Sequence, residues 1–144
     1  MKGERSKLRT YALFKKEIGL ESYLIEVENI TTRSLVTKFS LSNHKLMIEV
    51  GRHQGMEDRN ERVCPFCPDK VEDESHFLLF CPTYRIQRET FIDPIIRNQF
   101  VFSCLSVEKK MEYLLCKMDR DICQFIANSM EIREFLVNNP RRHM

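Results

Sequence analysis

Residues 64–81, CPFCPDKVEDESHFLLFC, place two cysteines, a histidine and a third cysteine in one short stretch. The spacing is Cys64-x2-Cys67-x8-His76-x4-Cys81. Two residues between the first two cysteines allow both thiolates to converge from a tight turn, as in the knuckles of structural zinc sites. We expect His76 and Cys81 at a helix start, where the four residues between them still allow both side chains to reach one ion. The stretch therefore predicts a zinc knuckle.

Three thiolates and one imidazole complete a tetrahedral Zn²⁺ shell and leave no position for water, so the predicted ion is structural and not catalytic. Two other interpretations of these residues are buried free cysteines and a redox pair. A thioredoxin-type redox pair needs a Cys-x-x-Cys motif at a helix N-terminus after a strand. Pro65, Phe66 and the polar connector GRHQGMEDRNER at residues 51–62 do not provide that context.

The residues around the ligands indicate a scaffold. The loop DKVEDES carries Asp69, Glu72, Asp73 and Glu74 against a single Lys70. A knuckle that gripped phosphates would need Lys and Arg there, because phosphate neutralisation dominates nucleic-acid affinity. The apolar residues 77–80, FLLF, lie between the last two ligands, and we expect them to anchor the knuckle in a hydrophobic core.

The composition of the whole chain places this knuckle in a helical domain. The 144 residues are 42% hydrophobic and 31% charged, which is typical of a folded chain that buries one core. Only 4 Gly and 5 Pro argue against a β-sandwich, which needs many tight turns. The predicted fold class is mainly α, a small helical domain with an inserted Cys-Cys-His-Cys zinc knuckle. The net charge of +2 is too small to indicate a nucleic-acid partner by itself.

The chain divides into three segments that we expect to form one cooperative domain: an N-terminal helical segment (1–60), the knuckle with the following helix start (61–90), and C-terminal helices (91–144). Apolar spacing predicts helices over 6–18 and 24–30, a helix ending near Ser40, and another that Ser42 caps and Gly51 ends. The β-branched residues at 30–37 leave a strand as an alternative there. Pro94 is expected in the first turn of a new helix. From Ser106 the pattern predicts two amphipathic helices, hinged near 119–121 and ended at 138–140.

Basic residues concentrate near the N-terminus and beside the knuckle. We interpret them as candidate phosphate contacts, with a solvated helix face as an equally weighted alternative. The candidates are Lys7, Arg9, Lys15, Lys16, Arg52, His53, Arg59, Arg62, Arg85 and Arg88.

The remaining reactive side chains form no catalytic constellation. Cys104, Cys116 and Cys123 lie among apolar residues and are expected to be buried thiols. His44 is expected to be a capping or surface residue in the Ser42 turn, with no nucleophile beside it. The sequence therefore predicts a chain that is not an enzyme and has no small-molecule substrate.

No apolar run approaches the roughly 20 residues of a membrane helix. The N-terminus, MKGERSKLRTYALFKK, lacks the apolar core of a secretory signal. Together with the clustered cysteines, this predicts an intracellular protein of the nucleus or cytoplasm that is not secreted and has no membrane partner.

The strings KFSLSNHKLMIEVGRH (38–53) and RVCPFCPDKVEDESHFLLFCPTYRIQR (62–88) resemble the C-terminal region of non-LTR retrotransposon reverse transcriptases. That family carries a Cys-Cys-His-Cys knuckle with this spacing after the polymerase thumb. The resemblance is best from Phe39 to Arg88, and a looser helical similarity runs to Phe135. It assigns Cys64, Cys67, His76 and Cys81 to the ligand positions, 72–74 to an acidic run, and Pro82 and Tyr84 to a Cys-Pro-x-Tyr motif.

The resemblance implies a structural zinc ion and a segment that helps a polymerase engage template RNA or target DNA. One departure is Ser40, which stands where relatives often have a basic residue. The larger departure is the absence of the paired aspartates of a polymerase and of any recognisable endonuclease, so this fragment is expected to lack polymerase activity.

The leading functional hypothesis is a non-enzymatic zinc-binding domain derived from a reverse transcriptase, with structural zinc and weak RNA or DNA binding through its basic flanks. The alternative is a helical module for protein–protein interaction or self-association without a nucleic-acid role. The acidic knuckle loop favours the alternative, and the basic N-terminus favours the first hypothesis.

Overall fold

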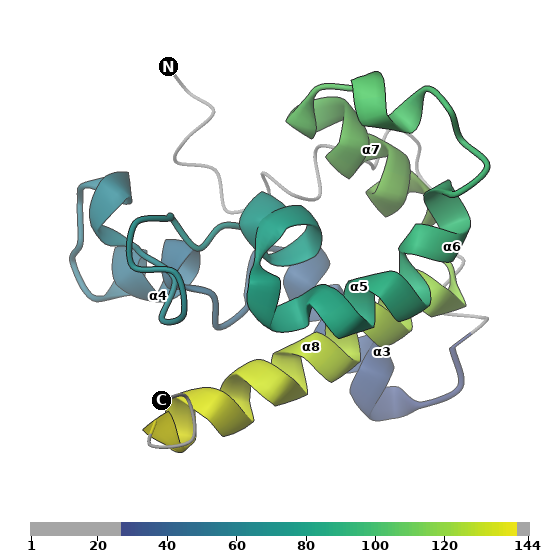
Figure 1. Ribbon diagram of the computed structural model, residues 1–144. Coiled ribbons are helices and arrows are strands. Elements are labelled where there is room, and N and C mark those ends of the chain that lie inside the picture. Colours follow the sequence, from purple (N-terminus) through teal and green to yellow (C-terminus); the bar gives the residue numbers. More distant parts are fainter. Residues whose placement is uncertain (1–26, 141–144) are drawn as a thin grey trace.

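The computed structural model describes residues 27–140, and this part of the chain is mainly helical, as predicted. The α-helices are α3 (Ile30–Ser40), α4 (Met47–His53), α5 (Arg85–Phe91), α6 (Asp93–Ile96), α7 (Val107–Lys117) and α8 (Arg120–Asn138) (Figure 1). Single turns lie at η1 (Arg59–Glu61), η2 (His76–Phe80), η3 (Pro82–Tyr84) and η4 (Phe102–Cys104). Within residues 27–140, the β pairing is one antiparallel bridge between Val63 and Val71. The strand alternative at 30–37 is wrong, because α3 occupies those residues.

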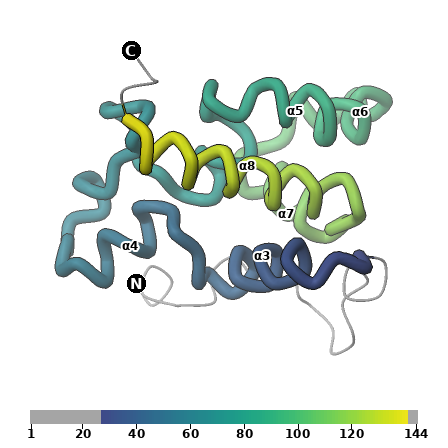
Figure 2. Tube along the Cα trace, turned by 90° about the horizontal axis from the view of Figure 1, so that it is seen from below, coloured from purple at the N-terminus to yellow at the C-terminus, as the bar shows by residue number. Residues whose placement is uncertain are grey.

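Helix α8 is the central helix of the fold. It lies between α3 on one side and α5 on the other (Figure 2). Asp119 caps it by accepting a hydrogen bond from the Ile122 amide at 3.0 Å. Buried residues at helical spacing then form its inner face: Ile122, Cys123, Phe125, Ile126, Ala127, Ser129 and Arg133. Phe135 and Val137 near its end are exposed, so the apolar stripe expected there does not continue to the end of the helix.

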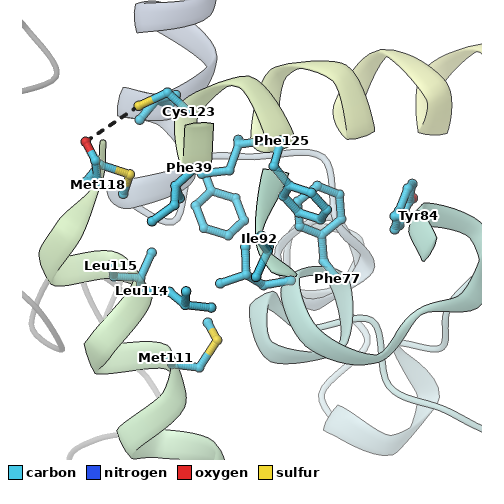
Figure 3. Close-up of a cluster of buried hydrophobic side chains, with 14 of the residues drawn as sticks. Phe39, Phe77, Tyr84, Ile92, Met111, Leu114, Leu115, Met118, Cys123 and Phe125 are labelled. Atoms are coloured by element: carbon cyan, nitrogen blue, oxygen red, sulfur yellow. Dashed lines mark hydrogen bonds between the residues drawn. The ribbon is translucent and has the colours of Figure 1, made fainter. Parts of the chain in front are cut away.

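The hydrophobic core joins the knuckle to the helices. Phe77 lies at its centre (Figure 3), with its ring 5.7 Å from that of Phe39 on α3 and 5.6 Å from that of Phe125 on α8. Tyr84 packs edge-on against Phe77 at 4.9 Å. Phe77 and Leu78 are fully buried, which confirms that the residues between the last two ligands anchor the knuckle. Phe80 does not contribute, since it is 51% exposed.

Ser42 ends α3 and does not begin α4, contrary to the prediction. Its φ of 54° is left-handed, and its amide donates to the Phe39 carbonyl while the Asn43 amide donates to the Lys38 carbonyl at 2.7 Å. These two bonds form a Schellman motif, which satisfies the last carbonyls of a helix. Helix α4 starts only at Met47.

Gly51 lies inside α4, and Gly55 ends the helix. Gly55 has a φ of +81°, and the Met56 amide donates back to the Gly51 carbonyl at 2.9 Å. Gly51 is needed for a different reason, because a Cβ there would lie 2.7 Å from Cγ of Arg62. The sequence pattern could not separate these two uses of glycine.

The later helix boundaries are as predicted. Pro94 lies in the first turn of α6, and Ser106 caps α7 by accepting from the Lys109 amide. The chain turns between α7 and α8 at Met118, whose φ is 29°. The predicted helix at 6–18 lies outside the described residues, and of the one at 24–30, residues 27–29 are not helical because Asn29 caps α3. In the described residues, no helix is both long and apolar enough to cross a membrane.

Candidate metal centre

The four predicted ligands converge on one point. Their ligand atoms all lie within 4.8 Å of one another. The Cys64 and Cys81 sulfurs are 3.9 Å apart, and the Cys67 and Cys81 sulfurs are 4.0 Å apart. Two thiolates bound at about 2.3 Å to one tetrahedral Zn²⁺ ion lie about 3.8 Å apart. The spacing of the sulfurs therefore fits a single tetrahedral ion, and the cluster could hold a metal.

A small hairpin positions Cys64 and Cys67. The Cys64 amide donates to the Lys70 carbonyl at 2.8 Å, and the Glu72 amide donates to the Arg62 carbonyl at 2.9 Å. Between them, Val63 and Val71 form the antiparallel bridge. The Cys67 amide folds back to the Cys64 carbonyl at 3.3 Å, so the reversal of the chain points both thiols to the same side.

A π-helical turn positions His76 and Cys81. The Cys81 amide donates to the His76 carbonyl at 2.7 Å, which closes an i→i−5 turn over His76–Phe80. Residues five apart in an α-helix lie about 140° apart around the axis, too far to share an ion easily. The wider turn brings the second residue back beneath the first, and π-turns of this kind are frequent at functional sites. The prediction of His76 and Cys81 at a helix start is confirmed, since η3 and α5 follow directly.

The centre is buried, and one of its nitrogen atoms lacks a partner. Cys64 and Cys81 are at most 1% exposed, and Cys67 lies at the edge. Nε2 of His76 is buried and has no hydrogen-bond partner. A buried imidazole nitrogen without a partner is costly unless it binds something, and a metal ion would use its lone pair.

The protonation of the thiols also favours a shared cation. The hydrogen bond between the Cys64 and Cys81 sulfurs lowers the pKa of Cys81 to about 3 and raises the pKa of Cys64. Burial raises the pKa of Cys67. The three thiols resist joint ionisation, since three negative charges this close would repel one another. A bound divalent ion would stabilise all three thiolates and release protons.

Glu72, expected to lie in an acidic loop, is buried and supports the centre. Its carboxylate accepts two hydrogen bonds from Arg133 on α8, at 2.7 and 2.8 Å. It also accepts one from the amide of Met47, the first residue of α4, at 2.7 Å. Sequence reasoning missed Arg133, which contacts Glu72 beside the candidate metal centre. The available signal was its position, because helical spacing places residue 133 on the buried face of α8, where an arginine is unusual.

The other two acidic side chains before His76, those of Asp73 and Glu74, also have internal partners. Asp73 accepts from the His76 amide at 2.8 Å and so caps the turn that carries this ligand. Glu74 pairs with His44, whose Nε2 lies 2.8 Å from Oε1 of Glu74. The His44 side chain is only 2% exposed, so its expected surface position is wrong; its Nδ1 does accept from the Leu46 amide, as a capping residue would.

Two of the arginines proposed for phosphate contact hold the knuckle together. Arg62 donates to the Met56 and Ile48 carbonyls, with Nε at 2.9 Å from the first. Arg88 donates to the Leu78 and Cys81 carbonyls, both at 3.0 Å, and so fixes the end of the π-turn. Both side chains are half-buried, and their donors point into the molecule.

The other phosphate candidates are at the surface or outside the described residues. Arg52 pairs with Glu49, Arg59 with Asp73, and Arg85 with Glu89. His53 is exposed at the end of α4. Lys7, Arg9, Lys15 and Lys16 fall in residues 1–26, outside the described part of the chain. Nucleic-acid binding by these residues stays a prediction.

Of the three remaining cysteines, only Cys123 is buried as expected. Its thiol donates to the Met118 carbonyl (Figure 3). Cys104 and Cys116 are exposed, because η4 and the outer face of α7 turn them to the surface.

Comparison with known proteins gives no match to this chain among family models, curated proteins or solved structures. The similarity to reverse transcriptases therefore rests on the quoted residues alone. The candidate metal centre rests on its own geometry.

Proposed function

We propose that this chain is a non-enzymatic domain built around a structural Zn²⁺ ion. The observation that carries the proposal is the convergence of four ligand atoms within 4.8 Å, from a hairpin and a π-turn. Three sulfurs and one imidazole nitrogen form the environment that zinc favours among the common divalent ions. All four positions come from the protein, which supports a role for the ion in folding.

Elemental analysis of the purified chain tests this proposal. We expect about one zinc per chain in the wild type, as for the one cluster found in residues 27–140, and none in Cys64→Ser. Cys104→Ser is the matched control because Cys104 is exposed and outside the cluster, so it keeps the wild-type zinc content. A wild-type chain that contains no metal, or a Cys64→Ser variant that keeps it, contradicts the proposal.

We propose further that the domain derives from a retrotransposon reverse transcriptase and binds RNA or DNA weakly through its basic flanks. The support is the resemblance of residues 39–88 to that family and the surface position of Arg59 and Arg85. Since Arg62 and Arg88 donate to backbone carbonyls, the phosphate contacts would come from the exposed arginines and the basic N-terminal segment.

Fluorescence anisotropy with labelled RNA and DNA at two salt concentrations tests nucleic-acid binding. The logarithm of the affinity should fall with the logarithm of the salt concentration, with a slope near −0.7 to −0.9 per phosphate contacted. An Arg59→Gln/Arg85→Gln variant should bind more weakly at low salt and show a smaller slope. The absence of binding to either nucleic acid at low salt contradicts this part of the proposal.

A protein-interaction module is the second candidate, and an open hollow beside the knuckle favours it. A cavity of about 500 Å³ lies between the knuckle and the end of α8, lined by Pro65, Phe66, Thr83, Leu136, Val137 and Pro140. Its volume is in the range of pockets that take a small molecule or the side chains of a partner. Light scattering during size-exclusion chromatography, on the wild type and on Val137→Asp, tests self-association. A wild-type monomer at every concentration argues against self-association, and a complex that survives the aspartate argues against this surface.

A further inference from the structure

Glu72 is the point where three parts of the chain meet. Its carboxylate binds Arg133 of α8 through two hydrogen bonds and the Met47 amide of α4 through a third. Its own carbonyl accepts from the Ile48 amide at 3.0 Å, and its own amide donates to Arg62 in the hairpin. The side chain is only 1% exposed, so these bonds are made without competition from water.

The contacts to α4 are those of a helix cap. Leu46, at the N-cap position of α4, makes no side-chain capping bond. The first amides of a helix need acceptors, and a carboxylate is favourable there because it opposes the positive end of the helix dipole. Glu72 supplies that acceptor from 25 residues further along the chain.

The contacts to α8 are those of a buried ion pair. Arg133 and Glu72 are 61 residues apart in sequence, and their side chains are 8% and 1% exposed. The pair holds residues 129–138, the C-terminal half of α8, beside the knuckle. A second contact, Lys45 to Glu134 at 2.9 Å, is exposed and adds little.

The position of Glu72 depends on the metal ligands on both sides of it. Glu72 lies between Cys67 and His76, so a bound ion would fix both ends of the segment that carries it. On that basis we propose that the loaded knuckle docks α4 and residues 129–138 of α8 through Glu72, and that loss of the metal releases these two helices. This inference rests on the proposed zinc centre.

Release would also open the cavity between the knuckle and α8. One wall of the cavity is the knuckle tip, Pro65 and Phe66, and the other is the end of α8, with Leu136 and Val137. These walls belong to the two elements that Glu72 and Arg133 join. The fold therefore contains a joint at which metal occupancy sets the position of the C-terminal helix.

Hydrogen-exchange mass spectrometry tests the joint on the full chain. We compare the zinc-loaded wild type, the same protein after chelation under reducing conditions, Glu72→Met, and Asp69→Asn. Methionine keeps the length of Glu72 but accepts none of its hydrogen bonds. Asp69 is an exposed acid of the same loop, so its variant is the matched control. Zinc content is measured on every sample.

We expect Glu72→Met to keep its zinc and to exchange at least tenfold faster in residues 47–50 and 129–138, while residues 111–126 stay protected. Chelation should accelerate hydrogen exchange in the same two regions, and Asp69→Asn should exchange at the wild-type rate. Should Glu72→Met fail to fold, Arg133→Lys is the milder variant. It removes the two hydrogen bonds from the guanidinium to Glu72. It should accelerate hydrogen exchange only in residues 129–138, because the bond from the Met47 amide to Glu72 remains.

The possible results separate this inference from the zinc proposal. A Glu72→Met chain that keeps zinc and exchanges like the wild type overturns the joint and leaves the zinc centre standing. The same holds if the milder variant, used in its place, exchanges like the wild type in 129–138. Equal acceleration throughout residues 27–140 after chelation also overturns the joint, because the metal would then hold the whole fold. If the purified wild-type chain contains no zinc, both the zinc proposal and this inference are wrong.

Discussion

The two ends of this molecule are stabilised in different ways. The apolar end, formed by α3, α6, α7 and the first half of α8, buries Leu114, Leu115, Ile122 and Ile126 completely. The metal end, formed by residues 62–81, α4 and residues 129–138, buries two cysteines, a histidine and the Glu72–Arg133 pair. Figure 1 shows the two ends on either side of the fold, with α4 at the left and α7 at the right.

The difference follows from what each segment has to bury. Helices with apolar stripes stabilise each other by removing hydrocarbon from water, at about 25 cal/mol per Å². The apolar side chains of the knuckle are concentrated in residues 77–80, so the rest of its chain path is fixed by ligand atoms and by hydrogen bonds to charged groups. Phe77 connects the two ends, since it follows a metal ligand and packs against Phe39 and Phe125. At the metal end, ligand atoms and polar contacts therefore add to the apolar packing of Phe77 and Leu78.

Removal of the metal should have the largest effect, because four ligand side chains from the hairpin and the π-turn would share one ion. A Cys81→Ser variant should lose several kcal/mol and melt on the order of 10 °C lower than the wild type. Thermal unfolding followed by circular dichroism measures this, with Cys116→Ser as the exposed control. If Cys81→Ser has the melting temperature of the wild type, the stability of the metal end does not depend on the metal ligands.

Breaking the buried ion pair should come next. Arg133→Met leaves the Glu72 carboxylate buried without its cation, at a cost of about 3–5 kcal/mol. Glu72→Gln/Arg133→Met removes both charges and should recover part of that loss. Urea unfolding measures both variants, with Lys45→Met as a control for an exposed pair worth about 0–1 kcal/mol. If Arg133→Met is at least as stable as Glu72→Gln/Arg133→Met, the buried charge of Glu72 is not the cause of the loss.

A cavity at the apolar end should lower stability without touching the metal. Leu114 is fully buried, so Leu114→Ala should cost about 2–5 kcal/mol. The zinc content should stay at the wild-type level because no ligand contacts this helix position. Urea unfolding and elemental analysis on the same sample test both halves. Loss of zinc in Leu114→Ala would show that the two ends do not form separate sources of stability.

The two glycines of the α4 region should give the smallest and most specific effects. Gly51→Ala places a Cβ 2.7 Å from Arg62 Cγ and should cost about 1–3 kcal/mol, because Arg62 must shift from the carbonyls that it holds. Gly55→Ala meets no neighbour but sits at a φ of +81°, so its cost should be about 1 kcal/mol. Unfolding free energies that reverse this order would contradict the packing of Arg62 against α4.

The sequence predicted those features that depend on local chemistry. The ligand set follows from residue type and spacing, and Pro94, Ser106 and the hinge before Asp119 follow from backbone preferences. Phe77 and Leu78 were predicted as anchors because they are apolar residues between two ligands.

The rest depends on contacts between residues far apart in sequence. Neither the pairing of Glu72 with Arg133 nor that of Glu74 with His44 leaves a periodic signal. The sequence therefore predicted only an acidic loop at 72–74, although Glu72 joins the hairpin to α4 and α8. Ser42 was misplaced because a serine that ends one helix and a serine that caps the next have the same local sequence signature.

X-ray absorption at the zinc edge of the purified protein reports the atoms bound to the metal and so tests the proposed ligand set. We expect three sulfur atoms at about 2.3 Å and one nitrogen at about 2.0 Å, supplied by Cys64, Cys67, Cys81 and His76. A shell made mainly of oxygen and nitrogen, or one with fewer than three sulfur atoms, would contradict it.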